Sequence, residues 1–155
     1  MCSSDLNSGQ TCACLKRLYV HDSIYEDVCR ELAAFSKNIT IGDGLSESSI
    51  LGPVQNERQF EIVSTFVEDA KQRGGRILTG GTRTSGPGYF YPITLVADVD
   101  HGCLLVDQEQ FGPALPIIRY HDVEESRPHA PKWTESWLVG QQEVEATPFP
   151  VQERF

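Results

Sequence analysis

A chain of 155 residues, 39% hydrophobic and 23% charged, has the size and composition of one ordinary globular domain. Its formal net charge of −9 argues against nucleic acid and anionic membrane surfaces as partners, because both require clustered Lys and Arg. No apolar run approaches the roughly 18–20 residues that cross a bilayer. The first residues also lack the features of a secretory signal peptide, so we expect a cytoplasmic protein.

Five cysteines occur in the chain: Cys2, Cys12, Cys14, Cys29 and Cys103. An odd number without the spacing of a disulfide framework predicts free thiols in a reducing compartment. The sequence contains no Cys-x-x-Cys pair and no Cys/His ligand pattern, so we expect no metal site. Most free cysteines are small buried hydrophobic residues, and the open question is whether one of these thiols is reactive.

The first part of the chain predicts a strand followed by a helix. Residues 17–20 indicate a short strand, and Ser23 with Glu26 has the spacing of a capping box at a helix N-terminus. An apolar stripe at three- and four-residue spacing then predicts a helix that ends near Asn38, before a glycine-rich loop. The stripe consists of Ile24, Tyr25, Val28, Leu32 and Phe35.

A second helix and three further strands are predicted downstream. Asn56 and Gln59 form a second capping box, followed by apolar residues with helical spacing. Strands are expected at 76–79 and 115–120, and 89–99 is expected to be partly an edge or irregular strand because Pro92 interrupts it. Strands that alternate with helices of this length predict an α/β fold of three layers, a mostly parallel sheet flanked by helices.

One string carries a chemical signal, namely Asn7-Ser8-Gly9-Gln10-Thr11-Cys12. It resembles the active-site motif of the aldehyde dehydrogenase superfamily, in which Gly-Gln-x-Cys carries the catalytic thiol. A second string, Glu109-Gln110-Phe111-Gly112-Pro113, resembles that family's Glu-x-Phe-Gly-Pro element at the expected distance downstream. Between them, Leu51-Gly52-Pro53, Gly80-Gly81 and residues 88–95 follow the family's order and spacing.

The resemblance implies NAD(P)-dependent oxidation of an aldehyde to a carboxylic acid, with Cys12 as the nucleophile. A thiolate suits this chemistry, because its adduct with an aldehyde expels hydride readily to a nicotinamide and leaves a thioester that water hydrolyses. The backbone N–H of Cys12 is implied as one donor of the oxyanion hole. Glu109 matches the residue that accepts hydrogen bonds from the ribose on the nicotinamide side, and Phe111 matches the aromatic residue beside the nicotinamide.

Other residues have simpler interpretations. Cys14 is expected to be a packing residue, and His21, His101 and His121 fall at element ends, where solvated histidines are expected. The resemblance covers about residues 7–125, which we expect to be a partial catalytic domain. The ends, 1–6 and 126–155, are expected to be non-homologous or disordered, since the stretch after 125 shows no helical or strand period.

The resemblance also implies what this sequence does not contain. The family's general-base glutamate lies some thirty residues before the cysteine, whereas eleven residues precede Cys12 here. The cofactor-binding half is missing as well, so we expect a fragment that is inactive alone, from a parent that is a homo-oligomer. The choice between NAD and NADP depends on that half, and much of the aldehyde-binding funnel comes from it.

Two alternatives remain open. One is a non-catalytic binding module that associates with intact homologues. The other is a cysteine hydrolase, because Gln10 before Cys12 resembles the oxyanion-hole glutamine of papain-like enzymes. The Cys-Gly-Ser-Cys-Trp surroundings of those enzymes and a His-Asn partner pattern are not evident in the sequence.

Overall fold

The structure, a computed structural model, describes residues 7–12, 14–122 and 136–139. Its strands and helices follow in the order β1 (Arg17–His21), the 3₁₀ turn η2 (Asp22–Ile24), α1 (Tyr25–Ser36), α2 (Glu57–Gln72), β2 (Arg76–Thr79), β3 (Thr94–Ala97), α3 (Leu104–Asp107), β4 (Ala114–Tyr120) and β5 (Ser136–Val139).

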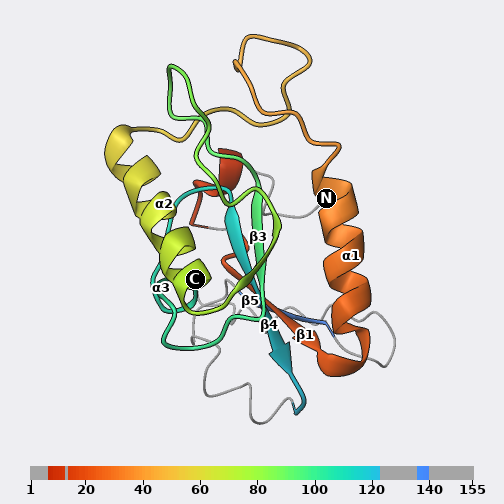
Figure 1. Cartoon of the computed structure of the whole chain (residues 1–155). Helices are drawn as coiled ribbons and strands as arrows, with labels where there is room; N and C mark the ends of the chain where they lie inside the picture. Colours follow the sequence, from red (N-terminus) through yellow and green to blue (C-terminus); the bar gives the residue numbers. More distant parts are fainter. Residues whose placement is uncertain (1–6, 13, 123–135, 140–155) are drawn as a thin grey trace, which may run out of the picture.

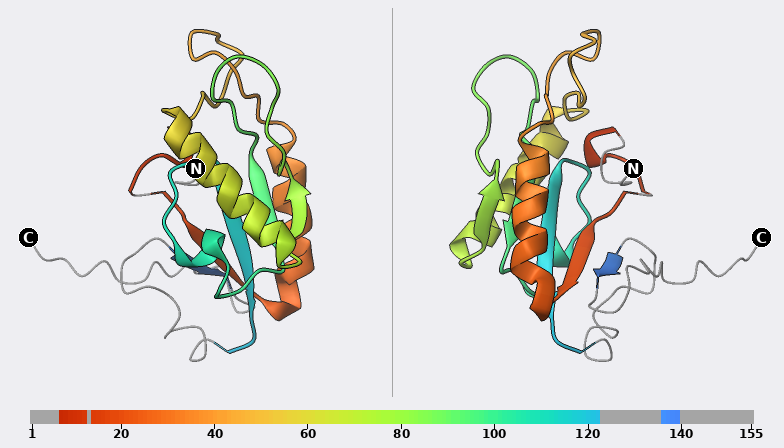
Figure 2. Two further views of the ribbon diagram at one scale, coloured as in Figure 1. Left: turned by 60° about the vertical axis from the view of Figure 1, so that its left-hand side comes forward. Right: turned by 90° about the vertical axis from the view of Figure 1, so that its right-hand side faces the viewer.

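The strands form one sheet in the order β2-β3-β4-β1-β5. The pairs β3–β4, β4–β1 and β1–β5 are parallel, and β2 is antiparallel to β3. Helix α1 lies on one side of the sheet and α2 with α3 on the other (Figures 1 and 2). The predicted three-layer α/β fold with a mostly parallel sheet is therefore confirmed.

Two apolar cores hold the layers together. Successive side chains of a strand point to opposite faces of a sheet. Accordingly Ile118 of β4 belongs to the core beneath α2 and α3, together with Val63 and Val96. Its neighbour Ile117 belongs to the core beneath α1, together with Tyr25. Each core residue of this central strand thus anchors one helical layer.

The helix starts agree only partly with the predicted capping boxes. Asn56 caps α2 as predicted, because its side chain accepts a hydrogen bond from the backbone N–H of Gln59 at 2.9 Å. The prediction at Ser23 is wrong: His21 accepts a hydrogen bond from Ser23 N, and the 3₁₀ turn η2 precedes α1. Phe35, the last residue of the predicted α1 stripe, is 58% exposed.

Three further elements differ from the sequence predictions. β3 is a buried interior strand rather than an edge strand, and it begins after Pro92. The four-residue helix α3 was not predicted, because it is too short to show a period. It is capped instead from another helix, by Asp69, whose carboxylate accepts a hydrogen bond from Leu104 N at 2.8 Å. The tail was expected to lack regular structure, yet β5 pairs with β1 in parallel. The rest of the two ends, residues 1–6, 123–135 and 140–155, lies outside the described residues.

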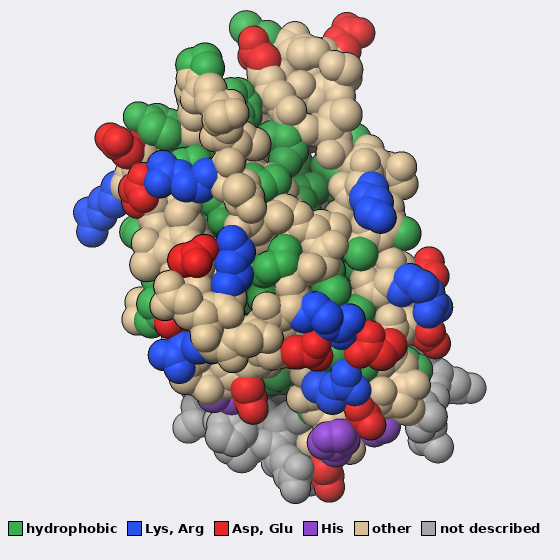
Figure 3. Space-filling model, viewed as in Figure 1, with side chains coloured by type: hydrophobic (Ala, Val, Ile, Leu, Met, Phe, Trp, Pro, Cys, Tyr) green, Lys and Arg blue, Asp and Glu red, His purple; other side chains and the backbone are tan. Residues whose placement is uncertain are grey.

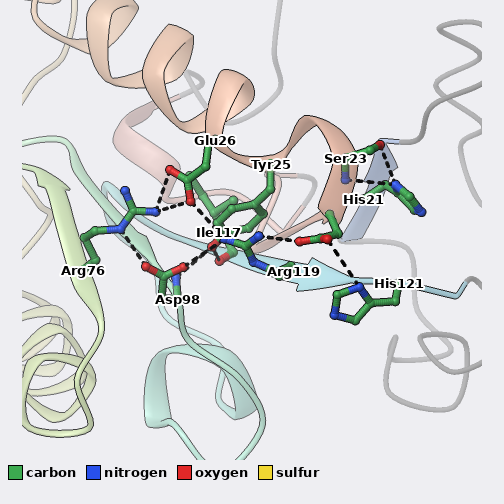
Figure 4. Close-up of polar contacts among 10 residues, drawn as sticks. His21, Ser23, Tyr25, Glu26, Arg76, Asp98, Ile117, Arg119 and His121 are labelled. Carbon is green, nitrogen blue, oxygen red and sulfur yellow. Dashed lines mark hydrogen bonds and ion pairs between the residues drawn. The ribbon is translucent and has the colours of Figure 1, made fainter.

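A network of ion pairs joins the elements at the carboxyl ends of the parallel strands (Figure 4). Arg76 lies 2.6 Å from Asp98 and 2.9 Å from Glu26. Arg119 contacts the same Glu26 at 2.9 Å and also pairs with Asp22. The space-filling view shows basic and acidic side chains alternating over the lower part of the side of the molecule that faces the viewer (Figure 3). Single exposed pairs contribute little stability, but this network connects β2, η2, α1 and β4.

Beneath the network, the Tyr25 hydroxyl bridges two strands. It donates to Ile117 O and accepts from Asp98 N, both at 2.8 Å. Tyr25→Phe should lower the free energy of unfolding by about 1–3 kcal/mol, because the buried carbonyl of Ile117 and the part-buried N–H of Asp98 lose this partner. Tyr89→Phe, at a residue that is 39% exposed, is the control. Equal denaturant midpoints for both variants would contradict the bridge.

The network also predicts how stability depends on pH. The hydrogen bond from Arg76 lowers the pKa of Asp98 below its ordinary value of 3.8, and that from Arg119 lowers the pKa of Asp22. A lowered native pKa stabilises the fold above the unfolded-state pKa, and this contribution disappears as the pH falls through the native pKa.

Asp98→Asn should therefore flatten the fall in unfolding free energy between about pH 5 and 2. Asparagine also tolerates the left-handed backbone of this residue, whose φ is +56°. Denaturant unfolding at a series of pH values measures the slope. Glu47→Gln, at an exposed carboxylate outside the network, is the control. A slope as steep as that of the parent chain would show that Asp98 is not involved.

Candidate active site

The two sequence motifs lie together at one edge of the sheet. The cysteine loop (residues 7–12) precedes β1, and the Glu109–Pro113 turn directly precedes β4. Because β1 and β4 are parallel neighbours, with Leu18 opposite Ile117, their amino ends meet at the same edge. In Figure 1, where the β4 arrow points downward, this edge is the upper end of the strands.

The cysteine loop has a left-handed backbone. Asn7, Ser8 and Gly9 have φ values of +50°, +56° and +75°. The turn is closed by Gln10, whose backbone N–H and side-chain Nε2 both donate to Asn7 O, at 3.1 and 3.0 Å. Cys12 follows this turn and is exposed. Non-glycine residues rarely adopt this conformation, and its occurrence in a run is typical of functional sites.

Two side chains attach the loop to the segment before α2. Ser8 Oγ donates to Gly52 O at 3.0 Å. Gln10 Nε2 donates to Pro53 O at 3.3 Å, while its Oε1 accepts from Gln55 N at 2.7 Å. Both the nitrogen and the oxygen of the Gln10 side-chain amide are therefore hydrogen-bonded to the backbone of this segment. These bonds explain a glutamine before Cys12 without a role in the oxyanion hole of a hydrolase.

The opposite side of the loop contacts the Glu109–Pro113 turn through two glycines. A Cβ at Gly9 would lie 2.3 Å from Gly112 O, and one at Gly112 would lie 2.4 Å from Val63 Cγ2. Contacts this short exclude a side chain at Gly9 unless the backbone of Gly112 moves, and at Gly112 unless the buried Val63 side chain moves. The two motifs are thus in direct contact, which their separation in sequence does not reveal.

Lys16 joins the same two segments and was not singled out by the sequence. Its side chain is buried, with only 4% of the residue exposed. Nζ donates to Gly9 O at 2.8 Å and to Gln110 O at 2.9 Å. It also lies 4.5 Å from the centroid of the Phe111 ring. The only signal in the sequence was a basic residue directly before a strand, which usually indicates solvent exposure.

Among the described thiols, Cys12 differs from the rest. Cys14, Cys29 and Cys103 are buried, and burial raises the pKa of Cys29 and of Cys103. Cys14 Sγ lies 2.6 Å from Thr11 Oγ1, and its burial agrees with the packing role predicted for it. Cys12 is exposed and is therefore the described thiol that an external electrophile can reach.

The predicted cofactor residues occupy the turn before β4. Glu109 is exposed and Phe111 is half-buried, with Gln110 buried between them. Gln110 Nε2 donates to Ala114 O at 2.5 Å, which fixes the turn to the start of β4. An exposed carboxylate can accept hydrogen bonds from two neighbouring hydroxyls, and a half-buried ring offers an apolar surface. These are the types of group that the resemblance predicts beside a nicotinamide and its ribose, and their role there stays a prediction.

The described histidines lie at the other end of the sheet. His21 ends β1, His121 follows β4 and His101 follows β3, and these strands are parallel. His101 and His121 are exposed as expected, but each also meets a carboxylate, at 3.1 and 3.7 Å. None of these three can serve as a base for Cys12 at the opposite edge, which argues against the cysteine hydrolase.

Two further findings concern the described part of the chain. No group of three or more His, Cys, Asp and Glu side chains there could hold a metal ion. None of its helices is long and apolar enough to cross a membrane.

The glycine contact gives a direct test of the site's geometry. Gly9→Ala should lower the free energy of unfolding by about 1–3 kcal/mol from backbone strain alone, and the clash with Gly112 O adds to this. Gly74→Ala is the matched control, because its φ of +91° brings the same kind of backbone strain while nothing lies within 4 Å of a Cβ there, so its loss should be smaller by the cost of the clash. Equal unfolding midpoints for both variants would show that the two motifs are not packed together.

The sequence matches the aldehyde dehydrogenase family over residues 1–130. It is 43% identical over 123 residues to a probable aldehyde dehydrogenase of a Pseudomonas species, covering 79% of this chain and 25% of that protein. It is 36% identical over 126 residues to the Schizosaccharomyces pombe protein named succinate-semialdehyde dehydrogenase (NADP(+)) 2, covering 80% and 26%. The structure of a lactaldehyde dehydrogenase superposes with a TM-score of 0.83 at 30% identity, over 91% of this chain and 30% of that one.

The chain thus spans about a quarter of the length of the curated relatives that it matches. Within the matched segment, the two motifs precede neighbouring parallel strands and their loops are in contact. The two motifs therefore form one candidate site. Because the family match covers most of the sequence, the chain belongs to the aldehyde dehydrogenase family.

Proposed function

We propose that residues 7–125 form the part of an NAD(P)-dependent aldehyde dehydrogenase that carries the nucleophilic thiol. The intact enzyme would oxidise an aldehyde to a carboxylic acid. The observation that supports this proposal most directly is the contact between the cysteine loop and the Glu109–Pro113 turn at one edge of the sheet. This contact supports a site in which the exposed thiol and the residues expected to hold a nicotinamide belong to adjoining loops.

The reaction begins with this chain's own nucleophile. The Cys12 thiolate adds to the aldehyde carbon, and the carbonyl π electrons become a negative charge on oxygen. A bound nicotinamide nucleotide supplies the acceptor for the hydride that leaves this carbon. As the hydride leaves, the oxyanion electrons would re-form the C=O bond, and the carbon, already bonded to Cys12 Sγ, would become a thioester. Water adds to the thioester, the carboxylic acid leaves, and the thiol is restored.

The cysteine loop suits the first of these steps because its backbone is already fixed. Charge develops on the former carbonyl oxygen, and a preorganised N–H donor stabilises such charge without reorganising during the reaction. By family resemblance the backbone N–H of Cys12 is one such donor. The loop is held from both sides, by Ser8 and Gln10 on one and by Lys16 on the other.

The cofactor proposal rests on Glu109 and Phe111. Glu109 would accept hydrogen bonds from the ribose hydroxyls, and Phe111 would contact the nicotinamide ring. The name of the Schizosaccharomyces pombe relative includes NADP(+), which supports a nicotinamide nucleotide as the class of cofactor. The choice between NAD and NADP depends on residues around the adenine ribose, so the proposal includes both cofactors.

The partners follow from the same assignment. The substrate is a small-molecule aldehyde, because the thiol is exposed and the relatives are aldehyde and semialdehyde dehydrogenases by name. The intact enzyme is proposed to be a homo-oligomer.

Acylation of Cys12 tests the nucleophile without a cofactor. With p-nitrophenyl acetate, the thiolate should attack the ester carbonyl, expel p-nitrophenolate and retain the acetyl group as a thioester. We expect a burst of about one p-nitrophenolate per chain, with the acetyl group located on Cys12 by peptide mass spectrometry.

Cys12→Ala should abolish the burst, whereas Cys29→Ala, at a buried thiol in α1, should retain it. Acetylation that maps to another cysteine, or a burst that survives in Cys12→Ala, would contradict the assignment of Cys12 as the nucleophile.

A further inference from the structure

A buried ammonium group connects the two halves of the proposed site. Lys16 precedes β1 by one residue and is only 4% exposed. Its Nζ donates to a carbonyl of the cysteine loop, Gly9 O, and to a carbonyl of the Glu109–Pro113 turn, Gln110 O. These acceptors lie 7 and 94 residues away in sequence. One side chain therefore spans the gap between the two motifs and is hydrogen-bonded to both.

The same ammonium group also faces the ring proposed to contact the nicotinamide. It lies 4.5 Å from the centroid of Phe111, which is within the range of a cation–π contact. Such contacts are stronger when the cation is removed from water. The position of the Phe111 ring is thus coupled to the carbonyl that precedes it and, through Lys16, to the cysteine loop.

Burial of a lysine is costly unless the charge has partners, so its presence here needs a reason. An apolar side chain of similar length could fill the space but would leave Gly9 O and Gln110 O without this donor. The other contacts of the loop do not replace it. Ser8 and Gln10 bind the segment before α2, and the contact of Gly9 with Gly112 tolerates no side chain but supplies no hydrogen bond.

We propose that Lys16 is a positioning residue that sets the distance and orientation of the Cys12 loop relative to Phe111. The proposal rests on the proposed function, since it assigns Cys12 and Phe111 to the same reaction. Lys16 acts through the two backbone carbonyls and the ring and need not touch the substrate. Its removal should release both segments together while the cores beneath α1 and α2 remain packed.

Lys16→Met in the full 155-residue chain is the test, because methionine keeps much of the apolar stem and removes the donors and the charge. Two reagents separate positioning from accessibility. Iodoacetamide alkylates any exposed thiolate by direct displacement, whereas p-nitrophenyl acetate requires the loop backbone to stabilise an oxyanion. We expect the rate of Cys12 acetylation to fall about 10- to 100-fold, with alkylation changed less than about threefold.

The control is Lys37→Met, at an exposed lysine just after α1, which should leave both rates unchanged. Hydrogen exchange supplies a second readout. Amides of residues 7–12 and 108–112 should exchange faster together in Lys16→Met, while those of β3 and α1 should not change. If Lys16→Met does not fold, Lys16→Gln, which keeps an N–H donor for one carbonyl, should show a smaller change in the same direction.

An unchanged ratio of acetylation to alkylation in a folded Lys16 variant would overturn the proposal. An equal loss in both rates, with faster exchange throughout the chain, would also overturn it and show a general structural role. The proposed function fails in a different way, namely if the parent chain shows no acetylation of Cys12. In that case the paired change in exchange of the two segments decides on Lys16 alone.

Discussion

The parallel pairing of β1 with β4 is the constraint on which the site depends. It places the segments before these strands, which are about a hundred residues apart in sequence, at one edge of the sheet. The pairing is stabilised on both faces, since β4 contributes alternate residues to the cores beneath α1 and α2. Core packing, far from either motif, therefore brings the two loops to the same edge of the sheet, and the contacts between the loops then fix how they meet.

The two edges of the sheet have different physical character. At the amino edge, the interactions are between buried or half-buried groups: backbone carbonyls, the ammonium of Lys16, and two glycines in contact. At the carboxyl edge, exposed arginines and carboxylates form an ion-pair network. In a low-dielectric region a hydrogen bond of a charged group is stronger and its loss more costly, so the amino edge is the one that can hold catalytic geometry rigidly.

Strong local signals were sufficient for most of the elements. The stripe of α1, the Asn56 cap of α2 and the strands at β1, β2 and β4 were predictable because period and capping are properties of short segments. Prediction failed where the decisive partner is distant. The helix α3 is capped by Asp69 of α2, β3 becomes an interior strand because β4 and β2 flank it, and β5 is defined by its pairing with β1.

By itself, the sequence determined the family, the candidate nucleophile and the residues expected at the cofactor, because these are carried by contiguous strings around Cys12 and Phe111. The tertiary structure decided which residues support them. Lys16 follows a buried cysteine and leucine and shows no motif, and only the folded chain brings Gly9 O, Gln110 O and the Phe111 ring around its ammonium group. A buried charge is specified by partners from several segments, and no local pattern encodes their convergence.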